Sequence, residues 1–300
     1  SKAIRLDYLH MKYFFNPFRR SVCPKCGKHY DPLSSSCPKC GQENKDIDPR
    51  GRCFSSLLTL GVYREIGLFL IGFVGLFLLA QFIGIIALNA EAMRYVQMGL
   101  SGDELESALT EYSSSVGFTL LVNDLAYALV FVGMLLYLWK DNRRLFRSFS
   151  NLKILSGFAV GFAMIVLSGI WNSIAIKLGA STNINQSVVE ETIQASPLLA
   201  IFVTGLIAPF VEELTYRVGA FTFFKRINTV LAYAVVGALF GLIHMKDFGS
   251  LNEWLSYPSY LIAGLCLCFA YDKFGFGGSF LAHAMNNVLA VVSCLLATGK

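Results

Sequence analysis

The stretch Pro209-Phe-Val-Glu-Glu-Leu-Thr-Tyr-Arg217 places two adjacent carboxylates and an arginine in an otherwise apolar part of the chain. It directly follows residues 198–208, which contain no charged side chain. An ionisable group at membrane depth is costly unless it pairs or faces water, so it marks a functional site by default. On a helix, Glu213 and Arg217 share one face, whereas Glu212 points about 100° away. We therefore expect a structural ion pair between Glu213 and Arg217, and a Glu212 that is available for chemistry.

The composition around this stretch is that of an integral membrane protein. Of the 300 residues, 55% are hydrophobic and only 15% are charged, whereas soluble domains carry about 25% charged residues. We expect an all-α polytopic fold with about seven transmembrane helices, and a range of six to eight, in the lipid bilayer. The expected spans are 66–88, 116–139, 154–177, 197–224, 229–244, 257–271 and 280–298.

Four cysteines near the N-terminus form two Cys-Pro-Lys-Cys-Gly sequences, with Cys23, Cys26, Cys37 and Cys40 as candidate metal ligands. Each Cys-x-x-Cys lets one tight turn present two thiolates to a single ion, and the glycine that follows permits the turn. Two such turns complete a closed, tetrahedral structural zinc site. Two disulfides are the alternative, but a stretch this polar has almost no core, and metal binding would supply its folding energy. We expect a small zinc ribbon that is structural or binds a cytosolic protein partner.

The charges of the loops predict the orientation of the chain. Residues 140–153 contain five bases and one acid, whereas 89–115 and 178–196 are acidic. The positive-inside rule therefore places the N-terminus and the 140–153 loop in the cytosol, which agrees with the reduced thiols that a zinc ribbon needs. The first 65 residues hold 12 of the 25 lysines and arginines, but six acids are interleaved. We expect no nucleic-acid partner.

Several residues inside the spans predict how the helices pack. Pro209 removes one helical hydrogen bond, so it should kink its helix and leave a carbonyl near the acids. We expect Asn123, Asp124 and Asn172 to form hydrogen bonds between helices. Glycines favour close packing of the third span against another helix. These glycines are Gly157, Gly161 and Gly169.

Two histidines, His244 and His283, lie in separate apolar segments. One histidine on an apolar face is more often a core residue, but two beside a carboxylate pair favour a site. His283 and Asn287 share one helical face, as do Phe240 and His244. Glutamate, histidines and asparagine together can activate water and stabilise an oxyanion in a hydrolytic site. Two histidines and a glutamate can also hold a catalytic metal, and the sequence leaves that alternative open.

Three motifs carry a family resemblance. Glu212-Glu213-x-x-x-Arg217, Phe240-x-x-x-His244 and His283-x-x-x-Asn287 occur in this order on successive apolar segments. They resemble the motifs of the CPBP family, the CAAX-protease and bacteriocin-processing intramembrane endopeptidases, also called the Abi family. The resemblance covers about residues 195–298. The N-terminal zinc ribbon resembles an accessory found on some bacterial relatives.

The resemblance implies an endopeptidase that hydrolyses a peptide bond of a membrane-embedded or membrane-associated protein. Glu212 matches the essential glutamate that activates water, and His244 matches the histidine that positions the water or a metal. His283 and Asn287 match the pair that binds the oxyanion or completes the polar site. The structural residues at the site are Glu213, Arg217 and Phe240.

The resemblance also sets the expected domains, the location and the competing functions. We expect a multi-pass protein of a bacterial cell membrane, and a prenylated CAAX substrate is not required of bacterial members. The alternative is a non-proteolytic immunity or scaffold protein of the same fold; a transporter is disfavoured because the two halves do not mirror each other. The expected domains are an N-terminal tail (1–20), the zinc ribbon (21–42), a linker (43–55), front transmembrane helices (56–194) and a CPBP-like catalytic core (195–300).

One geometric difficulty follows from straight helices. His283 would come soon after the turn near Lys273, whereas Glu212 and His244 would lie in the middle of the membrane or beyond. At about 1.5 Å per residue these depths do not coincide. We therefore expect residues 274–279 to dip into the protein as a re-entrant segment, which is allowed only where protein or water covers it.

Overall fold

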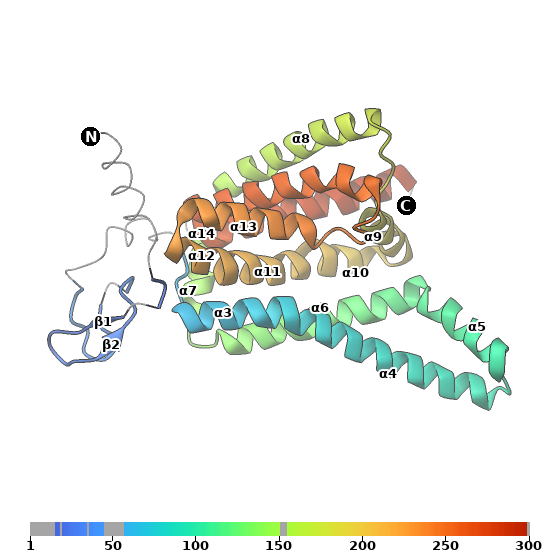
Figure 1. Cartoon of the computed structure of the whole chain (residues 1–300), viewed down its shortest axis with the longest axis horizontal. Coiled ribbons are helices and arrows are strands. Elements are labelled where there is room, and N and C mark those ends of the chain that lie inside the picture. The colour runs from blue at the N-terminus through green and yellow to red at the C-terminus, as the bar shows by residue number, and fades with distance from the viewer. Residues whose placement is uncertain (1–15, 19, 35, 45–56, 151–154, 299–300) are drawn as a thin grey trace.

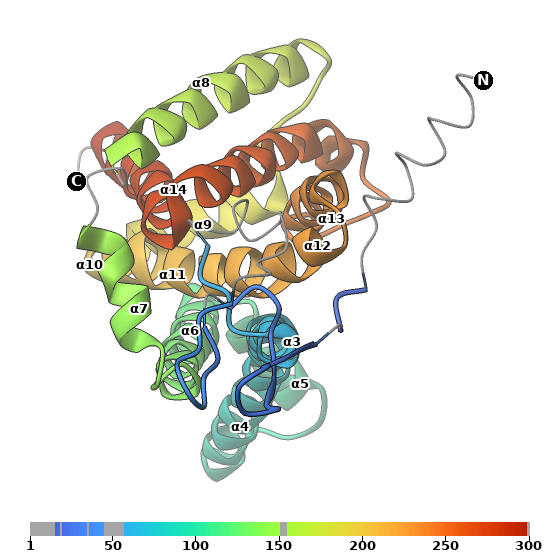
Figure 2. The ribbon, with the colours of Figure 1, turned by 90° about the vertical axis from the view of Figure 1, so that its left-hand side faces the viewer.

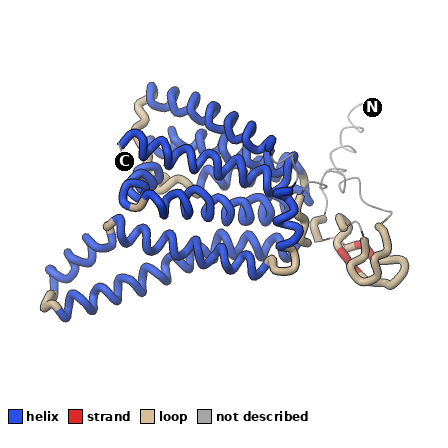
Figure 3. Tube along the Cα trace, turned by 180° about the vertical axis from the view of Figure 1, so that it is seen from behind, coloured by secondary structure: helices blue, strands red, loops and turns tan. Residues whose placement is uncertain are grey.

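The computed structural model of the chain describes residues 16–18, 20–34, 36–44, 57–150 and 155–298. Most of the expected N-terminal tail (1–20) and linker (43–55) lies outside the described residues. Nearly all regular structure in the described part is helical, and the strands are confined to the N-terminal ribbon, residues 20–34 and 36–44 (Figure 3).

The front of the chain contains a small strand pair and then helices. The strands β1 (Ser21–Val22) and β2 (His29–Tyr30) pair antiparallel, with Ser21 opposite Tyr30 and Val22 opposite His29. The following elements are α3 (Val62–Leu70), a π-helical segment η1 (Ile71–Gly75), α4 (Leu76–Gln97), α5 (Gly102–Ser113), α6 (Val116–Tyr137), α7 (Asn142–Arg147), a short 3₁₀ turn η2 (Ser148–Ser150) and α8 (Ser156–Lys177).

The second half is helical throughout. Its elements are α9 (Ile184–Ala195), α10 (Pro197–Phe202), the π-helical η4 (Val203–Ile207), α11 (Ala208–Glu212), the π-helical η5 (Glu213–Phe221), α12 (Thr222–Ile227), α13 (Thr229–Leu242) and α14 (Leu251–Thr298). The segments α10 to α12 form one continuous helix.

Five described helices are long and apolar enough to cross a membrane. They are Val62–Gln97, Val116–Tyr137, Ser156–Lys177, Pro197–Ile227 and Leu251–Ala297. A sharp turn at Gly275 divides the last of these, and α13 is apolar but has only 14 residues. The helices run side by side between the end that carries the ribbon and the opposite end (Figure 1). The all-α polytopic class is therefore confirmed, whereas the number of seven spans stays a prediction.

The helix Pro197–Ile227 lies at the centre of the bundle. Of its most apolar stretch 56% is buried, against 17–22% for the other four long helices. In the end-on view it lies between α3 and α6 on one side and α13 and α14 on the other (Figure 2). The outer helices expose apolar side chains instead, as lipid-facing helices do. Examples on α4 are Phe77, Leu78, Phe82, Ile85 and Ile86.

Pro209 lies just after the π-helical segment η4. There the N–H of Ala208 donates to the carbonyl of Val203, five residues back. The next hydrogen bond in this register would join the nitrogen of Pro209 to the carbonyl of Thr204, but proline has no N–H. The proline therefore frees the carbonyl of Thr204, about two helical turns before the acids, and a side chain described below uses it.

Glycines on α8 allow close packing against α14. A Cβ added to Gly157 would lie 2.3 Å from the carbonyl oxygen of Gly278, and one added to Gly161 would lie 2.9 Å from that of Ala282. Close packing is thus confirmed at these two positions. It is wrong for Gly169, where a Cβ would meet nothing within 4 Å.

The predicted hydrogen bonds between helices are likewise confirmed for one polar residue and not for two others. Asn172 on α8 accepts a hydrogen bond from the hydroxyl of Ser259 on α14, which confirms a bond between helices. Within the described part of the chain, Asn123 and Asp124 instead bond to each other at 3.4 Å. The bond that we expected from these two residues to another helix is therefore wrong. Because both residues lie on α6, the bond between them does not connect two helices.

The turn in α14 brings His283 into the bundle. Gly275 has φ 76° and ψ −170°, a conformation that favours glycine, and residues 275–279 are buried. The segment is covered by protein, as expected, but it is a helix interrupted at one residue rather than a re-entrant loop. His283 lies about 12 Å along the helix from this turn at 1.5 Å per residue. At this position Nδ1 of His283 lies within hydrogen-bond distance of Glu213.

The ribbon is attached to the bundle by a buried arginine. Arg226 on α12 contacts Glu65 of α3 through Nε and Oε2 at 2.6 Å, and Asp31 of the ribbon through NH2 and Oδ2 at 2.8 Å. Glu65 also accepts the N–H groups of Leu60 and Gly61, just before α3 begins. The ribbon, α3 and α12 are thus held at one point.

Two glycine substitutions on the same helix test the packing of α8. Gly161→Ala should lower the stability of the detergent-solubilised chain by about 1–3 kcal/mol, because the backbone of α14 must move. Gly169→Ala, where there is open space, should be neutral or stabilising by up to about 1 kcal/mol. Thermal unfolding followed by circular dichroism measures both, and equal effects of the two variants would contradict the packing.

Candidate active site

Four acidic and imidazole side chains from three parts of the chain meet in the bundle. Glu212 ends α11, Glu213 begins η5, His244 follows α13, and His283 lies in the second half of α14. The Phe240 ring lies between the imidazoles, with centroid distances of 4.8 Å to His244 and 5.7 Å to His283. The three sequence motifs are therefore adjacent in space.

Glu213 is the buried anchor of this cluster. Its Oε1 lies 2.9 Å from Nδ1 of His283, and its Oε2 lies 3.3 Å from Nε of Arg217. Both Glu213 and Arg217 are completely buried. The guanidinium carbon of Arg217 also lies 4.5 Å from the centroid of the Phe240 ring, a cation–π geometry. Glu213 thus connects the first motif to the third, and Arg217 connects it to the second.

Glu212 differs from Glu213 in the partner of its second oxygen: in the described part of the chain Oε2 of each has no hydrogen bond, but that of Glu213 contacts Arg217 and that of Glu212 contacts no arginine or lysine. Its Oε1 accepts a hydrogen bond from the hydroxyl of Tyr127 on α6 at 2.9 Å. Its Oε2 is buried, lies 3.8 Å from Nε2 of His283 and has no partner. Tyr127 therefore holds the carboxylate with one oxygen directed toward the histidine.

The sequence did not point to Tyr127. One tyrosine in an apolar span is ordinary, and no motif includes it. The signal that was present lies one helical turn earlier, where Asn123 and Asp124 make the same part of α6 polar. A polar stretch on a span indicates a face that lies against other helices, but the sequence does not say which spans are neighbours.

Hydrogen bonds fix the imidazole tautomers. Nδ1 of His244 lies 2.7 Å from the carbonyl oxygen of Phe240, and a carbonyl only accepts, so this nitrogen carries the proton. Nδ1 of His283 donates in the same way to the carboxylate of Glu213. In the neutral rings, each Nε2 then carries a lone pair. His283 presents that lone pair on the side where Glu212 lies.

Two acceptors therefore face each other at the centre of the site. Oε2 of Glu212 and Nε2 of a neutral His283 cannot bond to each other without a shared proton. At 3.8 Å they can both accept hydrogen bonds from one water molecule. This arrangement is suited to holding a water molecule by its two protons and to removing one of them.

Asn287 is directed to the carbonyl that Pro209 frees. Its Nδ2 donates to the oxygen of Thr204 at 2.9 Å, and its Oδ1 accepts from Nδ2 of Asn286 at 3.2 Å. A side-chain amide has two N–H groups, so one remains for another acceptor. The third motif thus supports the irregular helix that carries the first.

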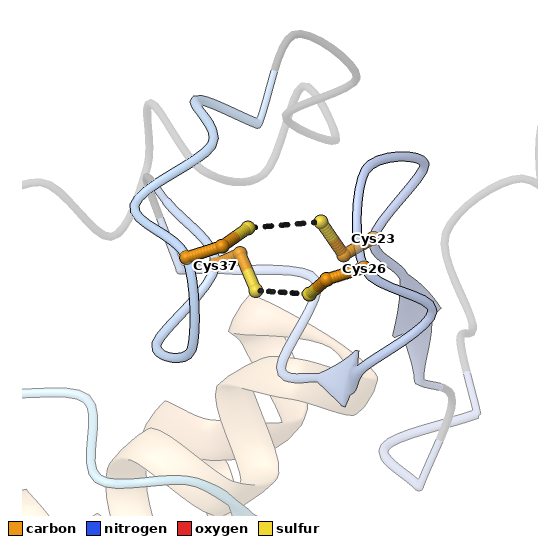
Figure 4. Close-up of side chains that lie close together, drawn as sticks. Cys23, Cys26 and Cys37 are labelled. Atoms are coloured by element: carbon orange, nitrogen blue, oxygen red, sulfur yellow. Dashed lines mark hydrogen bonds between the residues drawn. The ribbon is translucent and has the colours of Figure 1, made fainter.

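The four cysteines form a second, separate cluster in the ribbon (Figure 4). Their sulfur atoms all lie within 4.8 Å of one another, with 3.6 Å between Cys23 and Cys40 and between Cys26 and Cys37. These separations exclude disulfides, which need about 2.05 Å. They suit a tetrahedral ion with metal–sulfur distances of about 2.3 Å, for which sulfurs lie about 3.8 Å apart.

The turns around the cysteines are built for metal binding. Gly27 and Gly41 have φ of 67° and 71°, and each donates its N–H to the carbonyl of the first cysteine of its pair, Cys23 or Cys37, at 2.9 Å. Burial raises the pKa of Cys37, but hydrogen bonds from backbone N–H groups and neighbouring thiols lower it by more, so that the pKa is about 6. A thiolate, the form that binds metal, is therefore favoured at neutral pH at Cys37. A backbone N–H lowers the pKa of Cys40, whereas burial and the neighbouring thiols raise it by more, to about 11.

The cysteines are the one group in the described residues with three or more potential metal ligands this close together. Glu212, His244 and His283 are not gathered to that density. The donor set at the glutamate is therefore less suited to a metal than that of the ribbon.

Comparisons with known proteins find a family similarity in the part of the chain that carries the polar cluster. Residues 194–289, which include all three motifs, match the family model described as type II CAAX prenyl endopeptidase Rce1-like. The chain is also similar to the UPF0177 protein YvdC of Lactococcus lactis subsp. lactis (strain IL1403), with 30% identity over 149 residues. That match covers 49% of this chain and 54% of the relative, so the chain spans about half the length of the curated relative. No solved structure matches.

Proposed function

We propose that this chain, whose residues 194–289 form an Rce1-like domain of the CPBP family, is an intramembrane endopeptidase. Its substrate is a peptide bond of a membrane-embedded or membrane-associated protein. The observation that carries the proposal is the free, buried Oε2 of Glu212 beside Nε2 of His283. Tyr127 holds the other oxygen, so the base has a defined direction.

The proposed reaction is hydrolysis by a single activated water molecule. Oε2 of Glu212 removes one proton while the water oxygen bonds to the carbonyl carbon of the substrate. The tetrahedral intermediate then breaks the C–N bond, and the protonated Glu212 returns the proton to the departing nitrogen. His283 and His244, whose Nε2 atoms accept hydrogen bonds, orient the water, and the remaining N–H of Asn287 donates to the oxyanion.

The buried ion pair has a positioning role in this proposal. Glu213 fixes the tautomer and direction of His283, and Arg217 supplies the opposite charge that a buried carboxylate needs. Phe240 packs against Arg217 and both imidazoles. No step of the reaction passes through these three residues.

For the ribbon we propose a structural zinc ion held by the four cysteines, with ligand spacing as its support. Such an ion keeps the turns folded and performs no chemistry, because its four positions are filled. We propose that the ribbon end of the bundle faces the cytosol of a bacterial cell, which the need of a zinc ribbon for reduced thiols and the basic 140–147 segment support. A cytosolic protein is the expected partner of the ribbon.

The first prediction concerns Glu212. Membranes that contain the Glu212→Gln variant should lose every cleavage event that the wild-type chain produces, because an amide cannot accept the proton of water. Comparing membrane proteomes from cells that express each form measures this. Asp124→Asn, which removes another carboxylate from within a span, is the matched control and should retain the cleavage. Survival of the cleavage in Glu212→Gln membranes with normal expression would favour a scaffold or immunity protein.

The second prediction concerns Tyr127. Tyr127→Phe should lower kcat by about 10- to 100-fold and leave KM unchanged, because a hydrogen bond to a charged group contributes about 1.5–3 kcal/mol. Kinetics on a peptide from an identified substrate measures both constants. Tyr137→Phe on the same helix is the control. It also loses a tyrosine hydroxyl, but that hydroxyl donates to the backbone carbonyl of Arg64 and not to Glu212. Equal kcat losses in the two variants would contradict the positioning role.

The third prediction concerns metal content. The purified chain should contain about one zinc ion, and changing all four ribbon cysteines to serine should bring this to zero, because thiolates supply every ligand. Inductively coupled plasma mass spectrometry measures the ratio. Stoichiometric metal that remains in the cysteine-free chain and disappears with His244→Ala would contradict a metal-free role for Glu212.

A further inference from the structure

A cavity of about 420 Å³ lies between the ribbon and the start of α3. This volume is within the range of small-ligand sites, about 300–1,000 Å³. Four basic side chains and two exposed aromatic rings contribute to its lining. They are Arg20, Lys28, His29, Arg64, Phe18 and Tyr63.

The charges of this cavity are unbalanced. Asp31 also lines it, but its carboxylate is paired with Arg226. Arg64 is likewise committed to Asp141 on the far side. In the described part of the chain, Arg20 and Lys28 have no carboxylate partner, and Arg20 lies over the ring of Tyr63 at 5.6 Å. Two positive charges that have no carboxylate partner among the described residues therefore line the cavity, and they favour an anionic ligand.

The position of the cavity relative to the bundle narrows the class of anion. Its floor is formed by residues 60–64, and Val62 is the first residue of the first long apolar helix. Lipid headgroups lie where such a helix enters the bilayer. Tyr63 and Phe18 are 65% and 49% exposed, and their rings lie 5.9 Å apart. Exposed aromatic rings beside basic groups are typical of the membrane–water interface.

We propose that this cavity binds the phosphate headgroup of an anionic lipid. Arg20 and Lys28 contact the phosphate, and the rings of Tyr63 and Phe18 lie against the glycerol and the upper acyl chains. The bound lipid bridges the ribbon and α3, next to the ion pairs through which Arg226 holds the same two elements. This site is independent of the peptidase proposal, because none of its residues contacts Glu212, His244 or His283.

Native mass spectrometry of the full chain in detergent tests the site. The probes are phosphatidylglycerol, phosphatidylcholine and soluble glycerol 3-phosphate. The wild type should retain phosphatidylglycerol more tightly than phosphatidylcholine. The Arg20→Gln/Lys28→Gln variant should weaken phosphatidylglycerol binding by about fivefold for each charge removed. Lys28→Gln alone, which leaves Arg20 packed on Tyr63, provides a second variant with less risk to folding.

The matched control uses two other exposed lysines of the ribbon. Lys25 and Lys39 have the same charge and do not line the cavity. The Lys25→Gln/Lys39→Gln variant should bind phosphatidylglycerol as the wild type does. An equal loss in both double variants would show a diffuse surface charge and would overturn the proposal. So would wild-type binding by Arg20→Gln/Lys28→Gln, or binding of glycerol 3-phosphate as tight as that of the lipid.

Discussion

The buried contact between Glu213 and its two partners, Arg217 and His283, is the constraint on which the site depends. An isolated carboxylate inside an apolar bundle is strongly unfavourable, and removing one partner from such a pair costs about 3–5 kcal/mol. This cost restricts how the helices can be arranged, because α14 must bring His283 within hydrogen-bond distance of Glu213. The neighbouring Glu212 is carried to the same place by the backbone but is left with a free oxygen. Two adjacent glutamates therefore have different partners, Arg217 and His283 for Glu213 and Tyr127 for Glu212.

Irregular backbone makes this arrangement possible. The central helix is π-helical on both sides of α11, Pro209 leaves the Thr204 carbonyl free, and Asn287 occupies that carbonyl. Such segments inside an apolar bundle persist only where other groups satisfy the backbone. Gly157 and Gly161 of α8 let α14 approach closely. The turn at Gly275 lets the second half of α14 carry His283 to Glu213. The site is thus held by packing and hydrogen bonds from several helices, and no single motif would form it.

The sequence predicted what charge and spacing determine. The helical class, the cysteine cluster, the pairing of Glu213 with Arg217 and the proximity of the three motifs follow from the cost of buried charge and from helical periodicity. Three features could not be predicted, because they depend on which helices are neighbours and how each is rotated. They are the contact of Tyr127 with Glu212, the open space beside Gly169 and the bond between Asn123 and Asp124. From the depth mismatch the sequence predicted a buried irregular segment at 274–279, but it did not predict that a single residue, Gly275, interrupts the helix.

The central claim is that Glu212 activates water for peptide hydrolysis within the membrane. Proteoliposomes that contain the purified chain and extracted membrane proteins, incubated in water enriched in oxygen-18, test it most directly. The account predicts that new C-terminal carboxylates carry one oxygen-18 atom with the wild-type chain and that none form with Glu212→Gln. Equal labelling in the two samples, or no labelled termini with the wild-type chain, would contradict it.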